Sequence, residues 1–588
     1  VGIYSIMEIL NVAQKLDLTV EDVDKLTGPV LGRPKSATFR TGDVVGLDTL
    51  GNVARNLSAA LTHDEARSIF DIPAYLQSML NNKWLGDKTG QGFYKKTKNE
   101  KGETEILSLN LKTLEYGPQV KAKFATLDQT KTIDELNKRI PVLVKGQDKA
   151  GEFYRLTFAG LFSYVSHRIP EIADELYKID DAIKTGFGWE IGPFEIWETI
   201  GINEAIQFME QAGKRAAPWV LEMKEAGVTS FYKTENGKRL YYDIPSKSFK
   251  VIPGTEAFII LDNFRKTNKV WGNNGATILD IGDGVLNLEF HSKMNTLGGE
   301  VIEGINKAID LAEKDFRGLV IANEGANFSA GANLALLLMY AMEQEWDEIH
   351  MMVKQFQKTM MRARYSAVPV VVAPHNMALG GGCELTLHAD VAVAHAELYI
   401  GLVEFGVGLI PAGGGSKEFT LRASDAYEQG DIEYNTLGNL YMNIATAKVS
   451  TSAHEALENK ILRSMDKIVI NRNRQIATAK EEVLELANAG YTKPVERKDI
   501  KVQGRGGMAM FYTGANSMLR GGYISEHDLK ISQKLAYIMC GGDLSYPQLV
   551  SEQYLLDLER EAFVSLCGEK KTLERIQYTL NTGKPLRN

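Results

Sequence analysis

Two glutamates in one apolar region are the residues of this chain whose types and spacing could do chemistry. Glu384 lies two residues after the glycine run 380–382, and Glu404 lies further on among apolar residues. Burial in apolar surroundings raises the pKa of a carboxyl, so Glu404 could hold a proton at neutral pH. A carboxylate that orients a water and a carboxyl that donates a proton form an acid–base pair. A strand edge or a solvated surface would also accommodate such residues, and the residues alone leave both interpretations open.

Two glycine-containing turns could stabilise an anion beside this pair. Peptide N–H groups at the start of a helix have no partner within the helix and face whatever lies in front of them. Gly381 opens one such apolar helix pattern, and Ala332 has the same place in the segment 326–338. Two N–H donors that converge on one oxygen stabilise an enolate-like anion, by about 3–4 kcal/mol per donor. We therefore predict an oxyanion hole, for which a thioester carbonyl is a suitable guest.

The elements around these residues must bring them together. Between about 284 and 420, apolar strands such as 317–323 and 368–375 alternate with helix-period segments such as 297–314. This alternation is typical of β/α architecture. Residues after about 420 have a helical period almost throughout, whereas residues 231–283 contain short β-prone runs divided by Gly, Asn and Pro.

Residues 1 to about 95 and about 105 to 230 are predicted to be helical, with a charged connector between them. Segments 1–98 and 105–230 share a layout of an acidic helix end, a glycine-rich turn that holds a proline, and an apolar helix. This layout fits either a diverged internal repeat or two helix–turn–helix units. The chain starts in what looks like the middle of a helix, so we expect a preceding segment. The predicted fold class is multidomain α and α/β, divided into residues 1–98, 105–230, 231–283, 284–465 and 466–588.

Composition excludes several functional classes. A net charge of −8 without long basic runs argues against a nucleic-acid binder. Three cysteines without a CxxC spacing argue against a disulfide framework or a zinc site, and they fit a reducing, cytoplasmic setting. The chain has neither an apolar run of about 18 residues, which a membrane span would need, nor a signal-peptide pattern at its start.

Three motifs of the central region carry a family resemblance. They are ANFSAGANL, VPVVVAPHNMALGGGCELTLHADVAVA and IGLVEFGVGLIPAGGG. From about 284 to 420 the chain closely resembles the enoyl-CoA hydratase, or crotonase, superfamily, which implies a crotonase-like β/α spiral domain at 284–465.

That resemblance assigns roles to the four residues. It implies that the N–H groups of Ala332 and Gly381 bind the thioester oxygen of an acyl-CoA, while Glu384 and Glu404 hold and activate water. Many relatives that isomerise or hydrolyse acyl-CoAs carry one of these carboxylates, so the presence of both points to hydration. The chain departs from the family at Asn333, where Asp is common. It also departs at residues 402–403, where Leu-Val replaces Gln-Pro.

The helical segments resemble a second family. Residues 26–54 together with 88–94 are similar to the C-terminal helical domain of 3-hydroxyacyl-CoA dehydrogenases, and residues 186–201 are similar to a second, diverged copy. The whole chain resembles bacterial fused 3-hydroxyacyl-CoA dehydrogenase/enoyl-CoA hydratases of fatty-acid β-oxidation. In that family a Rossmann domain with a catalytic His–Glu pair precedes the helices. The resemblance implies that residues 36–40 shape the acyl-CoA cleft of the dehydrogenase.

The same resemblance sets expectations for cofactors and partners. NAD is expected only with the preceding domain, so this chain is predicted to bind no cofactor as catalyst, and its substrate is a coenzyme A thioester. A thiolase partner and a homo-oligomer are further family-level expectations. An enoyl-CoA isomerase and a non-catalytic scaffold subunit with the crotonase fold are the alternative functions.

Several weaker candidates for substrate or cofactor binding could equally be surface, core or helix-capping residues. Lys293, Asn333 and Leu334 are predicted substrate contacts, and Lys293 fits a CoA phosphate or a solvated surface equally well. The apolar run 335–342 could line an acyl tunnel or belong to the core. Residues 502–509 match GxGxxA without the strand–helix–strand context of a dinucleotide fold, which favours a helix-capping turn.

Two further features favour structural interpretations. His388 lies four residues after Glu384, half of a metal site, and a hydrogen-bonded core histidine is favoured. The charged residues of 559–576 are predicted to form a solvated face over a packed stripe.

Overall fold

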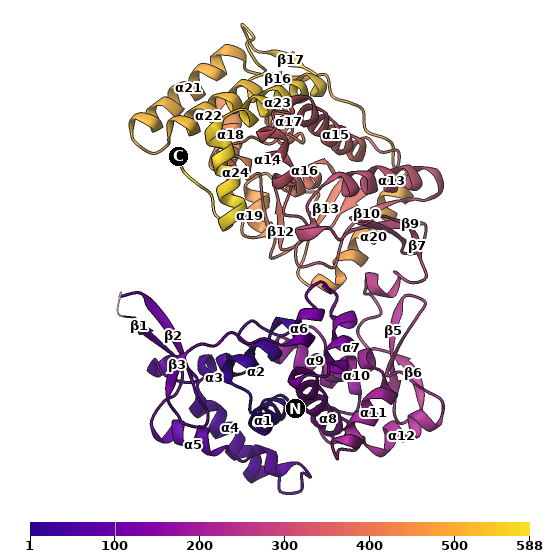
Figure 1. Cartoon of the computed structure of the whole chain (residues 1–588). Coiled ribbons are helices and arrows are strands. Elements are labelled where there is room, and N and C mark those ends of the chain that lie inside the picture. Colours follow the sequence, from indigo (N-terminus) through magenta and orange to yellow (C-terminus); the bar gives the residue numbers. More distant parts are fainter. Residues whose placement is uncertain (100–101) are drawn as a thin grey trace. The chain divides into compact units, whose positions relative to one another are not determined.

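The computed structural model describes residues 1–99 and 102–588, and they form two compact units. Unit 1 comprises residues 1–235 and 239–253, and unit 2 comprises residues 236–238 and 254–588. Helices dominate unit 1, and unit 2 contains a mixed sheet with helices on it, so the predicted fold class is confirmed (Figure 1). Within the described ranges, no helix is long and apolar enough to cross a membrane.

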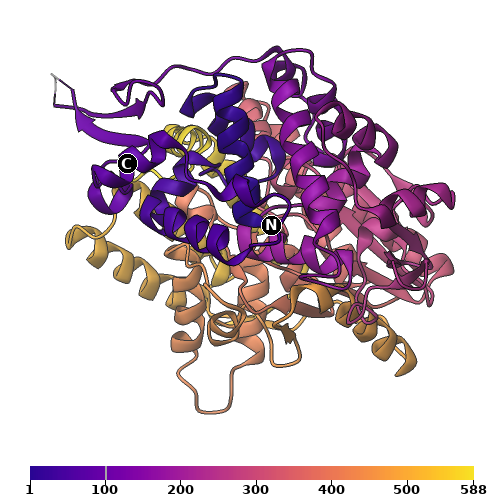
Figure 2. The same ribbon diagram turned by 90° about the horizontal axis from the view of Figure 1, so that it is seen from below.

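The core of unit 1 is built on amphipathic helices. The long helix α8 buries a dense aromatic and aliphatic face, and α1 and α11 pack against it. The ribbon of β1 and β2 extends away from the helices of this unit in both views (Figures 1 and 2). The elements up to residue 253 are α1 (Gly2–Lys15), α2 (Val20–Thr27), α3 (Phe39–Val45), α4 (Leu47–Ala60), α5 (Ala74–Asn81), β1 (Tyr94–Lys98), β2 (Thr104–Leu109), β3 (Tyr116–Pro118), α6 (Ala125–Gln129), α7 (Leu136–Lys145), α8 (Lys149–His167), α9 (Leu176–Phe187), α10 (Pro193–Ile200), α11 (Ile202–Gln211), α12 (Pro218–Glu225), β4 (Tyr232–Glu235), β5 (Lys238–Asp243) and β6 (Ser248–Val251).

The two helical halves use the same carboxylate clamp. Asp24 of α2 accepts the N–H groups of residues 38–40 at the start of α3, together with the hydroxyl of Tyr94 at 2.8 Å. Asp180 of α9 accepts the N–H groups of residues 194 and 195 in α10 and the hydroxyl of Tyr232 at 2.7 Å. The helix after each clamp ends at a glycine with φ near +100°. These contacts match between the two halves, and the assignment of residues 105–230 as a diverged second copy stays a prediction.

The sheet of unit 2 explains the apolar runs seen in the sequence. Its strand order is β15-β13-β11-β10-β9-β8-β7, and pairing is parallel from β15 to β9 and antiparallel from β9 to β7. Strands covered on both faces are apolar throughout, as Val370–Val372 is. The strands are β7 (Lys269–Gly272), β8 (Ala276–Asp280), β9 (Val285–Phe290), β10 (Gly318–Ile321), β11 (Val370–Val372), β12 (Met377–Leu379), β13 (Val391–His395), β14 (Tyr399–Gly401), β15 (Lys467–Val469), β16 (Ile500–Val502) and β17 (Gln548–Val550).

Helices cover both faces of this sheet. Helix α20 packs on β10, β11 and β13 around a small apolar cluster that includes Val320 and Val483, and the larger core lies beneath α13, α15 and α16. The helices are α13 (Gly299–Asp315), α14 (Leu334–Met342), α15 (Trp346–Arg364), α16 (Gly381–His388), α17 (Gly415–Asp425), α18 (Glu433–Ala445), α19 (Ala453–Glu458), α20 (Gln475–Asn488), α21 (Gly504–Arg520), α22 (Glu526–Met539), α23 (Glu552–Cys567) and α24 (Lys570–Thr582).

The residues of the predicted connector, 231–283, divide between two sheets. Strands β4–β6 form a three-stranded antiparallel sheet, whereas β7 and β8 pair with β9 at the edge of the large sheet. The five segment boundaries proposed from the sequence stay predictions.

Candidate active site

Three neighbouring parallel segments end at the predicted site. Ser329 pairs in parallel with Ala378 of β12, and β12 pairs in parallel with β14. The chain continues from these segments to Ala332, to Gly381 and to Glu404, respectively. Since the carboxyl ends of parallel strands meet at one edge, the sheet itself collects groups that are far apart in the sequence.

One pocket of about 290 Å³ contains the four predicted residues. Ala332, Gly381, Glu384 and Glu404 all line it, although they come from three separate places: the loop before α14, helix α16 and the turn after β14. The rest of its wall is mainly apolar and includes Leu336, Leu337, Tyr340, Phe356 and Phe563.

The two predicted oxyanion donors lie close together. A Cβ built on Gly381 would lie 3.7 Å from the peptide nitrogen of Ala332. Within residues 1–99 and 102–588, neither of these two N–H groups donates to a protein acceptor. Gly331, the residue before Ala332, has φ +96°, and a Cβ there would lie 2.8 Å from the Leu379 carbonyl oxygen. Glycine at 331 therefore allows the two turns to approach each other.

Glu384 is buried and held by backbone. It is 2% exposed, and its Oε1 accepts the N–H groups of Gly413 at 2.7 Å and Gly415 at 2.9 Å. Burial raises the pKa of Glu384 well above its usual value, and the negative charges of Glu404 and Glu559 raise it further. The two N–H donors oppose this shift because they favour the ionised form.

The backbone hydrogen bonds to Glu404 come from its own turn, from residues 403 and 404, and they lower its pKa. It begins the 3-10 turn Glu404–Val407, and its Oε1 lies 2.9 Å from the position of a Cβ built on Gly380. Its Oε2 is buried with no hydrogen-bond partner among the described residues. Burial raises the pKa of Glu404 to about 7, with a smaller contribution from the charge of Glu559. A carboxyl in this environment can hold a proton near neutral pH.

The predicted substrate contacts differ in their places. Asn333 lines the pocket, and its side chain caps α14 by accepting the N–H of Leu336 at 3.2 Å. Leu334 packs against the core, and Lys293 is exposed in the short turn Lys293–Asn295; neither is among the lining residues of the pocket. From the apolar run 335–342, Leu336, Leu337 and Tyr340 line the pocket. The roles of these residues stay predictions.

His388 is part of a buried polar network. It is 1% exposed, and its ring nitrogens contact the Glu384 carbonyl oxygen at 2.7 Å and Lys417 Nζ at 3.0 Å. Lys417 is fully buried and pairs with Glu418 and Glu552. The network lies behind Glu384 and fixes the helix that carries it.

The prediction of a solvated charged face at 559–576 is wrong for three residues. Glu559 and Arg575 are 0% exposed, and Arg560 is 9% exposed. Glu559 accepts backbone N–H groups of α17, and Arg575 pairs with buried Asp528 at 2.8 Å. No local sequence pattern indicates this burial, because the partners of these side chains lie far away along the chain.

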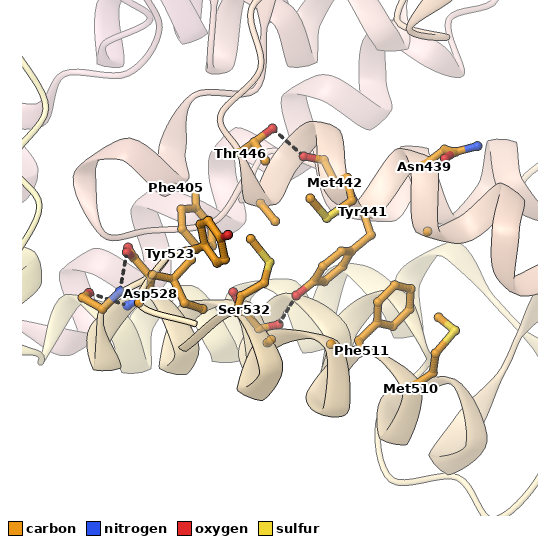
Figure 3. Close-up of a pocket in the computed structure, with 18 of the residues that line it drawn as sticks. Phe405, Asn439, Tyr441, Met442, Thr446, Met510, Phe511, Tyr523, Asp528 and Ser532 are labelled. Atoms are coloured by element: carbon orange, nitrogen blue, oxygen red, sulfur yellow. Dashed lines mark hydrogen bonds between the residues drawn. The ribbon is translucent and has the colours of Figure 1, made fainter. Parts of the chain in front are cut away.

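A larger groove elsewhere in unit 2 does not contain the predicted residues. It measures about 1230 Å³ and lies between α18, α21 and α22. Figure 3 shows methionine and aromatic side chains there, with the hydroxyl of Tyr441 donating to the Ser532 carbonyl oxygen at 3.0 Å. Asp528, its buried acid, is already paired with Arg575. Phe405 is its link to the candidate site, as the neighbour of Glu404 in the chain.

The structure also shows where the GxGxxA match at 502–509 and the predicted acyl-CoA segment 36–40 lie. Gly504 begins α21 after β16, which pairs antiparallel with β17, so the described residues do not fit a dinucleotide there. In unit 1, Ser36 and Thr38 line an apolar pocket of about 380 Å³ that also contains Arg33.

Comparison with known proteins identifies the relatives of the chain. A family model for enoyl-CoA hydratase/isomerase matches residues 280–426, and a model for the C-terminal domain of 3-hydroxyacyl-CoA dehydrogenase matches residues 1–96. The chain is 42% identical over 589 residues to a "Probable 3-hydroxyacyl-CoA dehydrogenase" of Bacillus subtilis, covering 100% of this chain and 73% of that protein.

Two shorter matches agree with the two family models. A second "Probable 3-hydroxyacyl-CoA dehydrogenase", from Deinococcus radiodurans, is 45% identical over 101 residues, 17% of this chain and 28% of its own length. A "Fatty acid oxidation complex subunit alpha" of a Psychrobacter species is 28% identical over 152 residues, 25% of this chain and 21% of its own. The chain therefore belongs to the family of proteins that join 3-hydroxyacyl-CoA dehydrogenase and enoyl-CoA hydratase in one polypeptide.

Proposed function

We propose that unit 2 adds water to the double bond of a trans-2-enoyl-CoA to give the 3-hydroxyacyl-CoA. The observation that carries this proposal is the meeting of Ala332, Gly381, Glu384 and Glu404 in one pocket. Family membership and the match of residues 280–426 support the same reaction class.

Each group has a role that its surroundings support. The N–H groups of Ala332 and Gly381 hold the thioester oxygen as negative charge develops there. A water oxygen bonds to Cβ and gives its proton to Glu384, and Glu404 gives a proton to Cα on the same face, so atoms and charge balance. We assign the proton to Glu404 because its Oε2 has no donor partner among the described residues, whereas two N–H groups favour the ionised form of Glu384. The coupled carboxyls titrate as a unit.

Substrate choice tests the proposal against its rivals. Crotonoyl-CoA and a 3-enoyl-CoA are offered separately to the purified chain, and loss of the conjugated-thioester absorbance is followed. Hydration predicts turnover of crotonoyl-CoA with formation of 3-hydroxybutyryl-CoA. An isomerase would convert the 3-enoyl-CoA and add no water to the 2-enoyl-CoA, and a scaffold subunit would bind neither ester in calorimetry.

For the longer protein we propose NAD-dependent oxidation of the 3-hydroxyacyl-CoA as the next reaction. The match of residues 1–96 to the dehydrogenase family and the pocket at Ser36 and Thr38 support a role of unit 1 in that substrate's binding. NAD itself is assigned to a preceding domain. A thiolase partner, a homo-oligomer and a cytoplasmic setting remain expectations from the family and the composition.

A further inference from the structure

The turn at residues 413–417, which leads into α17, is held by two buried carboxylates. Its five consecutive peptide N–H groups divide between Glu384 of α16 and Glu559 of α23. The donors to Glu384 are Gly413 at 2.7 Å and Gly415 at 2.9 Å, and the donors to Glu559 are Gly414 at 2.7 Å, Ser416 at 3.0 Å and Lys417 at 3.1 Å.

This division makes the place of Glu384 depend on Glu559. A carboxylate has two oxygens, and Glu384 uses one of them for both of its N–H donors. The remaining three N–H groups start a helix and have no partner inside it. Without Glu559 they would be buried without an acceptor, and the turn would have to move to reach one. Such a movement would carry the N–H groups of residues 413 and 415 away from Glu384.

Helix α23, which carries Glu559, also contributes to the wall of the site. Phe563, one turn further along α23, lines the pocket, and a Cβ on Gly414 would lie 3.5 Å from Leu556 of the same helix. Gln357 of α15 donates to the Leu556 carbonyl oxygen at 2.9 Å and approaches Glu559 at 3.4 Å. Helix α23 therefore packs against the turn that orients Glu384.

Charged groups that face Glu559 come from three other elements: Glu384 lies on α16, Glu404 on the turn after β14, and Lys417 on α17. The neutral amide of Gln357 on α15 contacts both Glu559 and Arg560. Burial raises the pKa of Glu559 to about 7, and its negative charge raises the pKa of Glu384 and of Glu404. Three carboxyls thus share one electrostatic environment.

We propose that Glu559 is a positioning residue of the hydration site: it locks the 413–417 turn in the place where that turn holds Glu384. This inference rests on the proposed hydratase function. On this proposal α23 does more than pack against the core, because its Glu559 helps to orient the catalytic Glu384.

The test compares Glu559→Gln with Glu561→Gln, a matched change at an exposed position of the same helix. Glutamine keeps the size of the side chain, removes the charge and places an NH₂ group against N–H donors. We expect kcat on crotonoyl-CoA to fall about 10- to 100-fold with KM nearly unchanged, because a small misplacement of a catalytic group has costs of that size. Glu561→Gln should match the wild type.

The pH profile separates positioning from packing. Loss of the Glu559 charge lowers the pKa of Glu404, so the fall of kcat/KM at alkaline pH should begin at a lower pH in Glu559→Gln. Glu559→Asp keeps the charge and shortens the reach, so it should lower kcat and leave this limb in place. The inference would be overturned if Glu559→Gln left both kcat and the alkaline fall of kcat/KM unchanged. A loss of kcat without any shift of this alkaline fall to lower pH would overturn it as well.

Folding and function are controlled in the same series. Thermal unfolding monitored by circular dichroism checks each variant, and if Glu559→Gln fails to fold, Glu559→Asp decides: wild-type kcat in it would refute the positioning role. If the wild type itself does not hydrate crotonoyl-CoA, the proposed function fails and this inference with it. If the wild type hydrates and the Glu559 variants behave like it, the inference alone fails.

Discussion

Half-buried or buried carboxylates accept peptide N–H groups at the starts of helices in both units, but their oxygens are occupied to different extents. In unit 1, both oxygens of Asp24 accept hydrogen bonds, three from N–H groups and one from the hydroxyl of Tyr94. In unit 2, one oxygen of Glu384 takes both of its N–H donors, and Oε2 of Glu404 has no partner among the described residues.

The difference separates a clamp from a reactive group. A carboxylate whose oxygens are all engaged holds two helices together and has no lone pair left for a ligand. A buried carboxyl with a free oxygen at a pocket is costly for the fold and remains able to exchange a proton. The candidate catalytic residues therefore differ from the clamp in having a carboxyl oxygen without a hydrogen-bond donor among the described residues. Burial and a raised pKa do not distinguish them, because burial raises the pKa of Asp24 to about 6 as well.

The largest effect should come from the reactive carboxyls. Glu384→Gln and Glu404→Gln remove an acid or a base while keeping side-chain size, so each should lower kcat on crotonoyl-CoA about 10²- to 10⁴-fold. Calorimetry with a CoA ester should show nearly unchanged binding. Asp24→Asn, the same kind of change in unit 1, should leave kcat at the wild-type value; a loss comparable to that of the glutamate variants would erase the distinction.

A backbone change should weaken the oxyanion hole. In Gly331→Ala the new Cβ would meet the Leu379 carbonyl oxygen and push the turns of Ala332 and Gly381 apart. Loss of one such donor lowers kcat about 10²- to 10³-fold in other enzymes, and we expect a fall of that order in steady-state kinetics.

Gly430 provides the control for this change. It has the same φ of +96°, and nothing lies within 4 Å of a Cβ built on it. Gly430→Ala therefore carries the same backbone strain without the clash, and its kcat should stay near wild type. Equal losses in the two variants would show that strain alone, and not the approach of the two turns, is responsible.

The clamp should affect stability and not hydration. Asp24→Asn places an NH₂ group among N–H donors, and we expect it to lower the free energy of unfolding of unit 1 by about 1.5–3 kcal/mol at pH 7.5. Urea unfolding followed by circular dichroism measures this. Asp128→Asn removes an exposed ion pair with Lys131 and should cost less than about 1 kcal/mol. Equal losses would mean that Asp24 is no clamp.

The smallest effect is the pH dependence. If Glu404 donates the proton to Cα, its acid form is required, and its pKa of about 7 is raised by burial. Hydration, measured as kcat/KM, should then fall as pH rises through about 7, by at most about tenfold per pH unit. The residual activity of Glu404→Gln should lack this limb. A profile that rises through neutral pH in the wild type would assign the proton elsewhere.

Sequence patterns identified much of this arrangement because they record local constraints. The continuous apolar run at 370–372 predicts a strand covered on both faces, and the alternation from 284 to 420 predicts the β/α region. Glycine before a helix start indicates free N–H groups, so Gly381 and Ala332 could be proposed without coordinates. Family motifs added the roles of Glu384 and Glu404.

Side chains whose partners are distant had no such signal. Lys293 looked as suitable as Asn333 for contact with the substrate, yet Asn333 lines the pocket and Lys293 is exposed at a turn. The charged run that contains Glu559 was predicted to be a solvated face. Helical spacing alone cannot show whether a carboxylate faces water or accepts hydrogen bonds from buried N–H groups of a distant turn. Nor could it show that Asp24 and Asp180 make equivalent contacts.

By itself the sequence determined the residue types, the turns that expose N–H groups and the apolar strands that require cover, because each depends on neighbours within a few positions. Only the tertiary structure decided which groups meet. Parallel pairing of the segment at Ser329 with β12 and β14 placed the two donors and Glu404 at one edge, and packing of α23 placed Glu559 against the turn that holds Glu384. Contacts between segments so far apart depend on how the sheet and its covering helices close, and no local pattern encodes that.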